Sequence, residues 1–415
     1  MEHDVFVGVD WGSEQHQVCL LRGPRFEPEQ RSFAHSSAGL QDLADWLAAR
    51  CQGQPERLGV AIEVPHGPVV EGLLERGLAV YALNPKQLDR FRDRHSAAGA
   101  KDDRRDALVL ADALRTDQRF FRRLVPDDPR VVQLREASRC DEELAREQNG
   151  LANRLREQLR RYWPALLAIA RDDLVDPFLW ALLERYRTPE QALRARPAAA
   201  TRLLKAHRIR RLSADQVLAA LHTPPLRLSP GTAAAASEHV LLLVPRLRLV
   251  TAQREQCTAR LAALIEELAA PDEDPQSARP TDVAILRSLP GVGTRVLARL
   301  LGEAAQPLAD RNLAVLRTHG GLAPVTKQSG KSCWVAMRRA CSSRLRLAFY
   351  PWSFAAMQHD PAARAHYLAL RAKGHSHARA LRGLMDRLLS VALAMLRDGT
   401  FYDPTRRSKS VPDSP

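Results

Sequence analysis

Aromatic residues and long apolar runs are both scarce in this chain of 415 residues. Phe, Trp and Tyr together make up 5% of it, and no apolar run approaches the about 18 residues that a membrane-spanning helix needs, so we expect no membrane segment. The first residues, MEHDVFVGVDWG, lack the basic start and long apolar run of a signal peptide, which predicts a cytoplasmic protein. A hydrophobic content of 45% and a charged content of 27% are typical of globular chains, and the length allows two or three domains.

Cysteine is rare as well, and its spacing is informative. None of the six cysteines forms a CxxC pair, so zinc is not expected, and buried free thiols are the better interpretation. The six are Cys19, Cys51, Cys140, Cys257, Cys333 and Cys341.

Acidic residues are depleted in the last third of the chain. The whole sequence has 62 Lys and Arg against 48 Asp and Glu, whereas residues 281–415 have 21 against 8. The remaining residues are nearly neutral, with 41 against 40. A basic domain beside a neutral one predicts a polyanionic partner, most often nucleic acid; a merely arginine-rich composition is the alternative.

Short apolar runs alternate with amphipathic stretches in the first hundred residues. Apolar and β-branched composition predicts strands, the second antiparallel to the first, at residues 5–9, 17–21, 58–63 and 79–83. Helices are expected at residues 41–50 and 68–76, and a basic helix or loop at residues 86–95. Strands that alternate with helices predict an α/β sheet with helices on its faces.

Four acids in this part are candidates for a shared site. Asp10 and Glu63 each end a predicted strand, where sites in α/β sheets lie. Asp103 and Asp106, within AKDDRRDALVLADA at residues 100–113, are three residues apart and share one face of a helix. Carboxylate oxygens suit Mg²⁺, and paired metal ions support phosphoryl transfer.

Each acid also has a simpler interpretation. Asp10 could cap a turn, Glu63 could pair with an arginine, and Arg104 and Arg105 could neutralise their acidic neighbours without a metal. GVDWGS also resembles the phosphate loop of actin-like and sugar-kinase-like ATPases, but the second acid-Gly-Thr loop and the Gly-Gly adenosine motif of those proteins are missing downstream.

The middle of the chain has a helical pattern. Apolar spacing at residues 131–170 suits a helical hairpin or a short dimeric coiled coil, and residues 178–268 continue as helices broken by prolines. Residues 271–280, PDEDPQSARP, are typical of a linker. Residues 285–301 then form a helix-hairpin-helix pattern, in which Gly291 and Gly293 would let the backbone approach a phosphate; a tight connection without a ligand is the alternative.

A loop rich in Gly, Ser and Lys is expected at residues 318–332, followed by a basic helix at residues 337–346. Ser329 lies there between Lys327 and Lys331, where a hydroxyl could hold or attack a phosphate, with His319 as a possible base. A simple loop serine is the alternative, and the competing serines are Ser332, Ser342 and Ser343. Residues 360–398 are expected to form two helices with a basic and aromatic patch, and residues 401–415 a disordered tail.

The order of these features resembles the DEDD-type insertion-sequence transposases, the insertion sequence one-hundred-ten family, also called bridge-RNA-guided recombinases. The resemblance rests on the strand-end acids, on KDDRRDA at residues 101–107, on LPGVG and on GLAPVTKQSGKS at residues 321–332. It covers residues 6–115 and 286–396, more than half of the chain. Asp102 departs from many members, which have an uncharged residue there, and the loop has one Ser before one Gly where some members have doubled residues.

The resemblance implies an RNase-H-like, RuvC-like N-terminal domain in which Asp10, Glu63, Asp103 and Asp106 bind Mg²⁺. It also implies a mostly α C-terminal transposase domain in which Ser329 becomes covalently linked to DNA. A structured guide RNA would pair with donor and target DNA, in a homo-oligomer that is a dimer or a tetramer. The residues expected to contact nucleic acid are Lys101, Arg104, Gly291, Gly293, Lys327, Lys331, Arg338 and Arg339.

The sequence therefore predicts a Mg²⁺-dependent DNA recombinase. Its expected regions are the RuvC-like domain at residues 1–125, a helical spacer and oligomerisation region at 126–280, the transposase domain at 281–400 and the tail at 401–415. Two alternatives remain: a RuvC-like nuclease or junction resolvase that uses water, and a non-catalytic nucleic-acid-binding protein.

Overall fold

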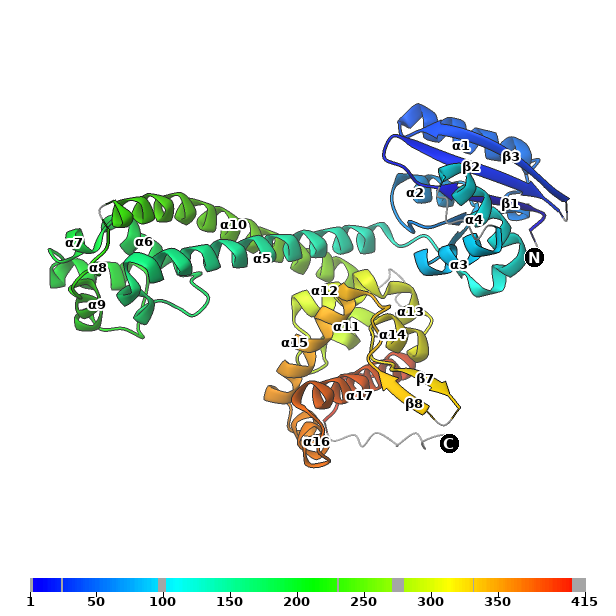
Figure 1. Ribbon diagram of the computed structural model, residues 1–415. Helices are drawn as coiled ribbons and strands as arrows, with labels where there is room; N and C mark the ends of the chain where they lie inside the picture. Colours follow the sequence, from blue (N-terminus) through cyan, green and yellow to red (C-terminus); the bar gives the residue numbers. More distant parts are fainter. Residues whose placement is uncertain are drawn as a thin grey trace. The chain divides into compact units, whose positions relative to one another are not determined.

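The computed structural model describes residues 3–23, 25–95, 102–229, 231–270, 280–330 and 332–404. The chain divides into two compact units, Met1–Asp128 and Pro129–Pro415 (Figure 1). Among the described residues, no helix is both long enough and apolar enough to cross a membrane.

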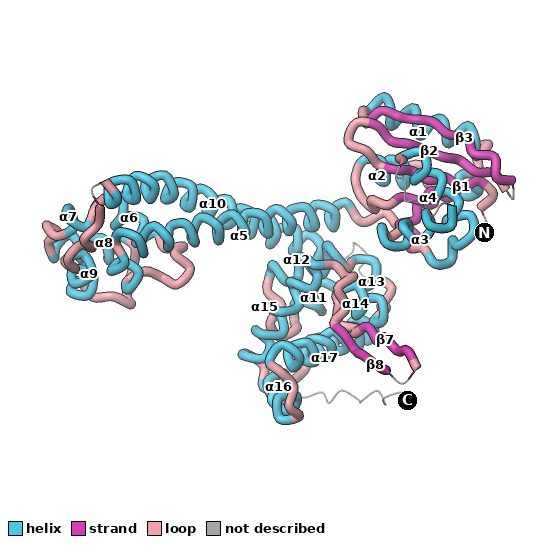
Figure 2. The backbone as a smooth tube through the Cα atoms, in the orientation of Figure 1, coloured by secondary structure: helices cyan, strands magenta, loops and turns pink. Residues whose placement is uncertain are grey.

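The first unit is built on a six-stranded mixed sheet with the order β3-β2-β1-β4-β5-β6. Figure 2 shows the neighbouring strands β3, β2 and β1 of this sheet. Strands β1, β2 and β3 are antiparallel neighbours, β1, β4 and β5 are parallel neighbours, and β6 is antiparallel to β5. The strands are β1 (Val5–Asp10), β2 (Gln15–Arg22), β3 (Arg25–Ala34), β4 (Leu58–Ile62), β5 (Ala79–Ala82) and β6 (Arg122–Arg123). The four predicted strands and the antiparallel pairing of the first two are confirmed.

The strand β3 has no counterpart among the predicted strands. Its sequence, RFEPEQRSFA, is mostly polar because β3 is an edge strand, and it lacks the apolar run that marks the buried strands. Phe33 is its buried anchor against α1, where it packs edge-on to Trp46 with the ring centroids 5.6 Å apart.

Helices cover both faces of this sheet. They are α1 (Ser37–Arg50), α2 (Pro68–Glu75), α3 (Pro85–His95) and α4 (Asp103–Asp117), with short 3-10 turns η1 (Pro55–Arg57) and η2 (Gln118–Phe120). Val7, Val9 and Val60 share a core with α1 and α2, whereas Phe6 and Ala61 on the other face share a core with α3 and α4. This alternation is the period of two that a strand requires.

Gly8 fixes the position of α4 over the centre of the sheet. A Cβ atom at Gly8 would lie 2.0 Å from the Ala107 carbonyl oxygen and 2.5 Å from the Ala111 amide nitrogen, so a side chain there would push the helix away. The glycine therefore lets α4 pack directly on β1 at Ala107 and Ala111.

The second unit begins with two long helices that run side by side. Helices α5 (Pro129–Tyr162) and α10 (Thr232–Ala269) are antiparallel, because Gln148 pairs with Thr251 and Gln133 with Arg260. The C-terminal half of α5 and the N-terminal half of α10 share a core of Leu, Val and Trp side chains with several short helices. These are η3 (Pro164–Ala168), α6 (Pro177–Arg185), α7 (Pro189–Ala192), α8 (Pro197–Ala206) and α9 (Ala214–Leu221). The helical hairpin suggested for residues 131–170 is therefore not formed there: these residues supply one long helix, and its antiparallel partner is α10 of the same chain.

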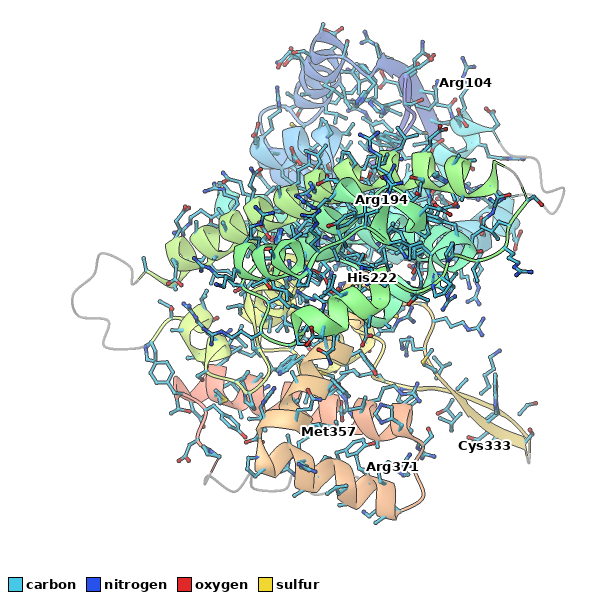
Figure 3. The ribbon with its side chains drawn as sticks, turned by 90° about the vertical axis from the view of Figure 1, so that its left-hand side faces the viewer. Arg104, Arg194, His222, Cys333, Met357 and Arg371 are labelled. Atoms are coloured by element: carbon cyan, nitrogen blue, oxygen red, sulfur yellow. The ribbon has the colours of Figure 1, made fainter. Side chains whose placement is uncertain are left out.

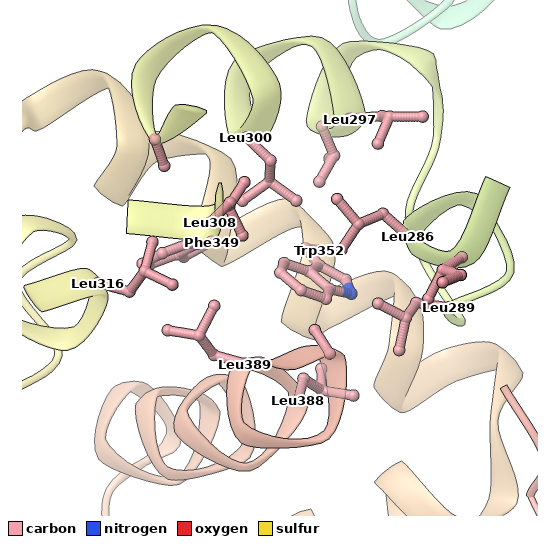
Figure 4. Packing of buried hydrophobic residues seen from close by; sticks show 14 of the residues in the cluster. Leu286, Leu289, Leu297, Leu300, Leu308, Leu316, Phe349, Trp352, Leu388 and Leu389 are labelled. Atoms are coloured by element: carbon pink, nitrogen blue, oxygen red, sulfur yellow. The ribbon is translucent and has the colours of Figure 1, made fainter. Parts of the chain in front are cut away.

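The rest of the second unit is a helical core with a small β-ribbon. Its elements are α11 (Asp282–Arg287), α12 (Thr294–Glu303), α13 (Ala305–Ala309), α14 (Leu313–His319), β7 (Val325–Ser329), β8 (Ser332–Ala336), α15 (Ser343–His359), α16 (Pro361–Ala372) and α17 (His377–Asp398). Trp352 is the largest side chain in this core, where Leu286, Leu297 and Leu388 surround it (Figure 4). The helical remainder, the helix pair at residues 360–398 and the two helices around PGVG are confirmed.

Two expectations were wrong in the C-terminal region. The strands β7 and β8 form an antiparallel hairpin where a loop was expected, and residues 337–342 are not helical, so the helix begins at Ser343. The many Gly, Ser and Lys residues predicted a loop, although the segment contains two strands. The turn between them includes Gly330, where φ is +55°. The linker at residues 271–279 and the tail from residue 405 lie outside the described residues.

Candidate active-site residues

Asp10 and Glu63 lie at the carboxyl ends of two adjacent parallel strands. The register pairs Val9 of β1 with Ile62 of β4, so the two acids occupy the next position on each chain. Successive strand residues point to opposite faces, so Asp10 lies on the same face as Phe6, the face that α4 covers. Glu63 directly follows β4 and, two residues after Ala61, lies on that face too. Both are half-buried. The structure thus brings these two predicted residues together at one edge of the sheet.

Asp103 and Asp106 both lie in the first turn of α4, as their spacing predicted. Asp103 is exposed, whereas Asp106 is buried against the sheet. Asp102 is instead the N-cap of α4, and its carboxylate accepts the Arg104 amide at 3.3 Å. The cap fixes where the helix begins and so determines which of the acids follow on its faces.

Asp106 is paired with an arginine that no sequence motif marks. Arg92 on α3 donates Nε to Oδ1 at 2.6 Å and Nη2 to Oδ2 at 2.7 Å, so one guanidinium takes both carboxylate oxygens. The bond to Asp106 raises the pKa of Arg92, with weaker contributions from Asp89 and Glu63. The guanidinium therefore lies within the electrostatic reach of two predicted metal ligands.

This arrangement differs from a loaded metal site. Within the described part of the chain, no three His, Cys, Asp or Glu side chains gather closely enough to hold a metal ion. Arg92 supplies the positive charge that Asp106 needs, with Asp89 as a further partner of the same guanidinium. In the sequence, the only indication of this pairing is that the basic segment of α3 precedes the acids of α4. That pattern does not distinguish Arg92 from the other arginines of α3.

A histidine pair supports the turn that follows Asp10. His16 is fully buried, its Nδ1 accepts the Gly12 amide at 3.4 Å, and its Nε2 meets His35 Nδ1 at 2.9 Å. Burial, together with the neighbouring His35, lowers the pKa of His16. Trp11 packs against both rings. A neutral His16 can accept at one nitrogen and donate at the other, so this pair holds the turn in place.

The helix-hairpin-helix glycines have distinct environments. Gly291 has φ at +78°, and a Cβ atom there would lie 2.7 Å from both the Ala356 amide nitrogen and the Trp352 carbonyl oxygen. It is thus required for packing against α15. Gly293 is exposed, is the N-cap of α12 and faces open space. The open helix start at Gly293 is the part of the motif that a phosphate can approach.

Ser329 ends β7 at the turn of the β-ribbon and pairs with Ser332 on β8. Both residues are exposed, and Lys327 on β7 is exposed as well. Ser342 instead caps α15 by accepting the Leu345 amide, which gives it a structural role. The remaining serine candidate, Ser343, is the first residue of α15.

The other predicted nucleic-acid contacts are spread over both units. Arg104 is exposed on α4 (Figure 3), and Arg339 is exposed after the β-ribbon, whereas Arg338 is half-buried and donates Nε to the Ala323 carbonyl at 3.2 Å. Lys101 and Lys331 lie outside the described residues. His319, the possible base, contacts the Glu303 carbonyl at 3.2 Å.

Comparisons with known proteins agree with the two regions of resemblance. A family model for the DEDD transposase of IS110, described as a transposase, matches residues 7–164, and the model described as "Transposase IS116/IS110/IS902 family" matches residues 283–368. The first match contains all four acids and the second contains Ser329.

Curated relatives carry related descriptions. The chain is 53% identical over 210 residues to "Putative transposase y4uE" of Sinorhizobium fredii, a match that covers 50% of this chain and 58% of that protein. It is 31% identical to "Mini-circle putative transposase for IS117" of Streptomyces coelicolor, over 97% of this chain and 96% of the relative. It is also 31% identical to "Insertion element IS110 uncharacterized 43.6 kDa protein" of the same organism, over 96% and 95%. A match of this identity over nearly the full length of both chains means that the protein belongs to the IS116/IS110/IS902 family of transposases.

Proposed function

We propose that this transposase cuts and rejoins DNA with two sets of residues, the acids of the first unit and the serine of the β-ribbon. The observation that carries the proposal is the adjacent position of Asp10 and Glu63 at the ends of β1 and β4, on the side that α4 covers. The order of three antiparallel strands followed by two parallel ones, with the acids at strand ends, supports an RNase-H-like, RuvC-like domain.

The same acids are suited to a divalent cation. Hard carboxylate oxygens are the donors that Mg²⁺ prefers, and the guanidinium on Asp106 marks a position where the protein already needs positive charge. Asp10, Glu63, Asp103 and Asp106 would hold Mg²⁺, with Asp103 approaching from the exposed side of the helix turn that it shares with Asp106. When bound, the ion stabilises negative charge on a phosphate. Arg92 would have to release Asp106 first.

The ribbon supplies a nucleophile of the right chemistry. Oγ of Ser329 would form a bond to a DNA phosphorus as the bond from that phosphorus to the leaving sugar oxygen breaks. The serine proton is given up, the leaving sugar oxygen takes a proton, and the phosphate remains joined to the protein. Attack by the free hydroxyl of another strand reverses these steps and returns the serine. An exposed serine at a turn, two residues from the exposed Lys327 on the same strand, supports this role.

The partners follow from the resemblance and from charge. We propose that donor and target DNA, together with a structured guide RNA, bind the basic C-terminal region, where residues 281–415 hold 21 Lys and Arg against 8 Asp and Glu. The chain would act as a dimer or tetramer. The division of the second unit at residue 280 into a helical spacer and a transposase domain belongs to the same proposal.

One experiment tests the chemistry. The full chain is incubated with the DNA ends of its element, the flanking transcript and Mg²⁺, and the products are run on a denaturing gel to detect a protein–DNA adduct. Ser329→Ala should abolish the adduct, whereas Ser332→Ala, which alters the residue directly opposite, should retain it. Asp10→Ala should abolish cleavage itself.

The rival mechanisms predict other patterns. A nuclease that uses water would leave cleavage intact in Ser329→Ala and would form no adduct with the unaltered chain. A protein that only binds nucleic acid would show no cleavage, and Asp10→Ala would then change stability alone. Recombination without an adduct would overturn the serine chemistry.

A further inference from the structure

The β-ribbon of β7 and β8 has no buried face. All of its described residues from Thr326 to Val335 are exposed, and it stands clear of the helices of its own unit (Figures 1 and 3). A two-stranded hairpin on its own is marginally stable in water, because neither face is covered by a core. An exposed ribbon that carries large apolar side chains is typical of a contact surface.

The register assigns each ribbon residue to one of two faces. Directly opposed residues lie on the same face, and successive residues alternate. Ser329, Lys327 and Trp334 therefore share one face, because Lys327 is opposite Trp334 and two residues from Ser329. The contact of the Lys327 ammonium with the Trp334 ring, 5.6 Å from its centroid, agrees with this assignment. Val335, opposite Thr326, lies on the other face.

Trp334 is a large aromatic side chain left 58% exposed, a fraction similar to those of Phe120, Tyr350 and Phe401 elsewhere in the described chain. Val335 is exposed to the same extent, 59%, but offers no π-face. Along β7, Lys327 and Ser329 are separated by about 7 Å, the rise of two strand residues. The indole ring thus lies about one nucleotide step from the proposed nucleophile on the same surface.

The charge around the ribbon points to a polyanion. Residues 311–359 contain eight Lys and Arg and no Asp or Glu, and the ribbon lies in the middle of this stretch. Three of these cations, Arg311, Arg317 and Arg344, pair with acids from outside the stretch, whereas Lys327 on the ribbon lies over the Trp334 ring. An apolar protein partner could cover the Trp334 ring but would offer no negative charge to the Lys327 ammonium. A nucleic-acid strand supplies both a base for the ring and a phosphate for the ammonium. A planar base gains most from an exposed indole when it is unpaired and free to stack.

We propose that Trp334 is a positioning residue for DNA, on which an unpaired base of the cleaved strand stacks. The base would lie on the indole, the neighbouring phosphate would meet Lys327, and the next phosphodiester would face Ser329. This inference rests on the proposed function for the choice of DNA. It adds a residue outside the motifs of the sequence, and it gives the exposed indole of the ribbon a role.

The test compares four full-length proteins: unaltered, Trp334→Val, Trp334→Phe and Val335→Ala. Valine keeps the strand propensity and removes the π-face, phenylalanine keeps a π-face, and the third variant changes the opposite face. Binding of a fluorescent single-stranded DNA oligonucleotide is measured at one fixed salt concentration. We expect about 5- to 150-fold weaker binding for Trp334→Val, the cost of one lost stacked base. Trp334→Phe and Val335→Ala should stay within about threefold of the unaltered chain.

A second readout separates positioning from folding. In the adduct assay, Trp334→Val should need more DNA to reach half of its maximal rate but should approach the unaltered maximal rate at saturation. A lowered maximal rate with unchanged DNA affinity would overturn the inference. So would equal losses for Trp334→Val and Val335→Ala, equal losses on duplex and single-stranded DNA, or a loss confined to RNA.

Failure of this inference is distinguishable from failure of the proposed function. Unchanged DNA affinity in Trp334→Val, with an adduct that still depends on Ser329, would overturn the role of Trp334 and leave the serine chemistry standing. Weaker DNA binding in Trp334→Val, with no adduct from any protein, would remove the serine chemistry and leave the stacking contact supported.

Discussion

Removal of Arg92 should destabilise the first unit and make it respond to divalent cations. The Asp106 side chain is 1% exposed, and both of its oxygens accept from Arg92, at 2.6 and 2.7 Å. Arg92→Ala would leave this carboxylate buried without its partner. Breaking a buried pair in this way costs about 3 kcal/mol. The matched control is Arg94→Ala on the same helix, because Arg94 is 54% exposed and reaches Asp117 only at 3.4 Å, a pair worth less than about 1 kcal/mol.

Mg²⁺ should restore much of the stability that Arg92→Ala loses. A cation that binds only the folded state at one hundred times its dissociation constant adds about 2.7 kcal/mol. The unaltered chain must first break the Arg92–Asp106 pair, so its response to Mg²⁺ should be smaller. Asp106→Asn combined with Arg92→Ala should remove the response, because the buried charge is gone.

Amide hydrogen exchange of the full chain, with Mg²⁺ or with EDTA, is the appropriate assay. Peptides from β1 and α4 report on the first unit alone, which matters because a chain of two units need not unfold in one step. Faster exchange in Arg92→Ala that Mg²⁺ reverses would agree with the reasoning. Exchange in Arg92→Ala that matches Arg94→Ala, or that ignores Mg²⁺, would refute it.

Three further predictions concern the supports of the two units. Gly8→Ala should destabilise the first unit by about 3 kcal/mol. Gly72→Ala is the control: a Cβ atom there would have only the end of the flexible Arg76 side chain nearby, at 3.8 Å, and should stabilise the unit by about 0.5 kcal/mol. Denaturant titration of both variants measures these changes. Gly291→Ala should cost about 2 kcal/mol through strain and overlap with α15. Gly293→Ala, which meets open space but replaces a favourable N-cap residue, should cost less, about 0.5 kcal/mol; exchange in α12 measures both. The lowered pKa of His16 means that, below the ordinary value of 6.5, the unfolded chain binds this proton more readily than the folded chain. The stability of the first unit should therefore fall as the pH decreases through 6.5. His16→Gln should flatten that slope in urea titrations at several pH values.

The sequence was sufficient to predict the elements whose residue types depend directly on burial or on helix spacing. The Val-rich runs around Val7 and Val60 predicted buried strands because only a covered strand is apolar on both faces. The three-residue spacing of Asp103 and Asp106 correctly placed both on one helix turn. The adjacent position of Asp10 and Glu63 in space followed from parallel pairing, which strand-end acids could suggest but not establish.

Other features depend on contacts that no local pattern encodes. The pairing of Arg92 with Asp106 joins two helices and is decided by how α3 packs on α4. The residues around Gly330 have the composition of a turn and so predict a loop, because the strands of the ribbon have no buried face that would make them apolar. Exposure of Trp334 could not be predicted either, since an aromatic residue in a short apolar run usually marks a core.

The most direct test of the proposed metal site is anomalous diffraction from crystals of the full chain soaked in Mn²⁺. We predict a peak bound to the carboxylates of Asp10 and Glu63, about 2.1 Å from their oxygens, with Asp106 turned from Arg92 toward the same ion. A map without such a peak at saturating Mn²⁺, in which Arg92 still holds Asp106, would contradict it.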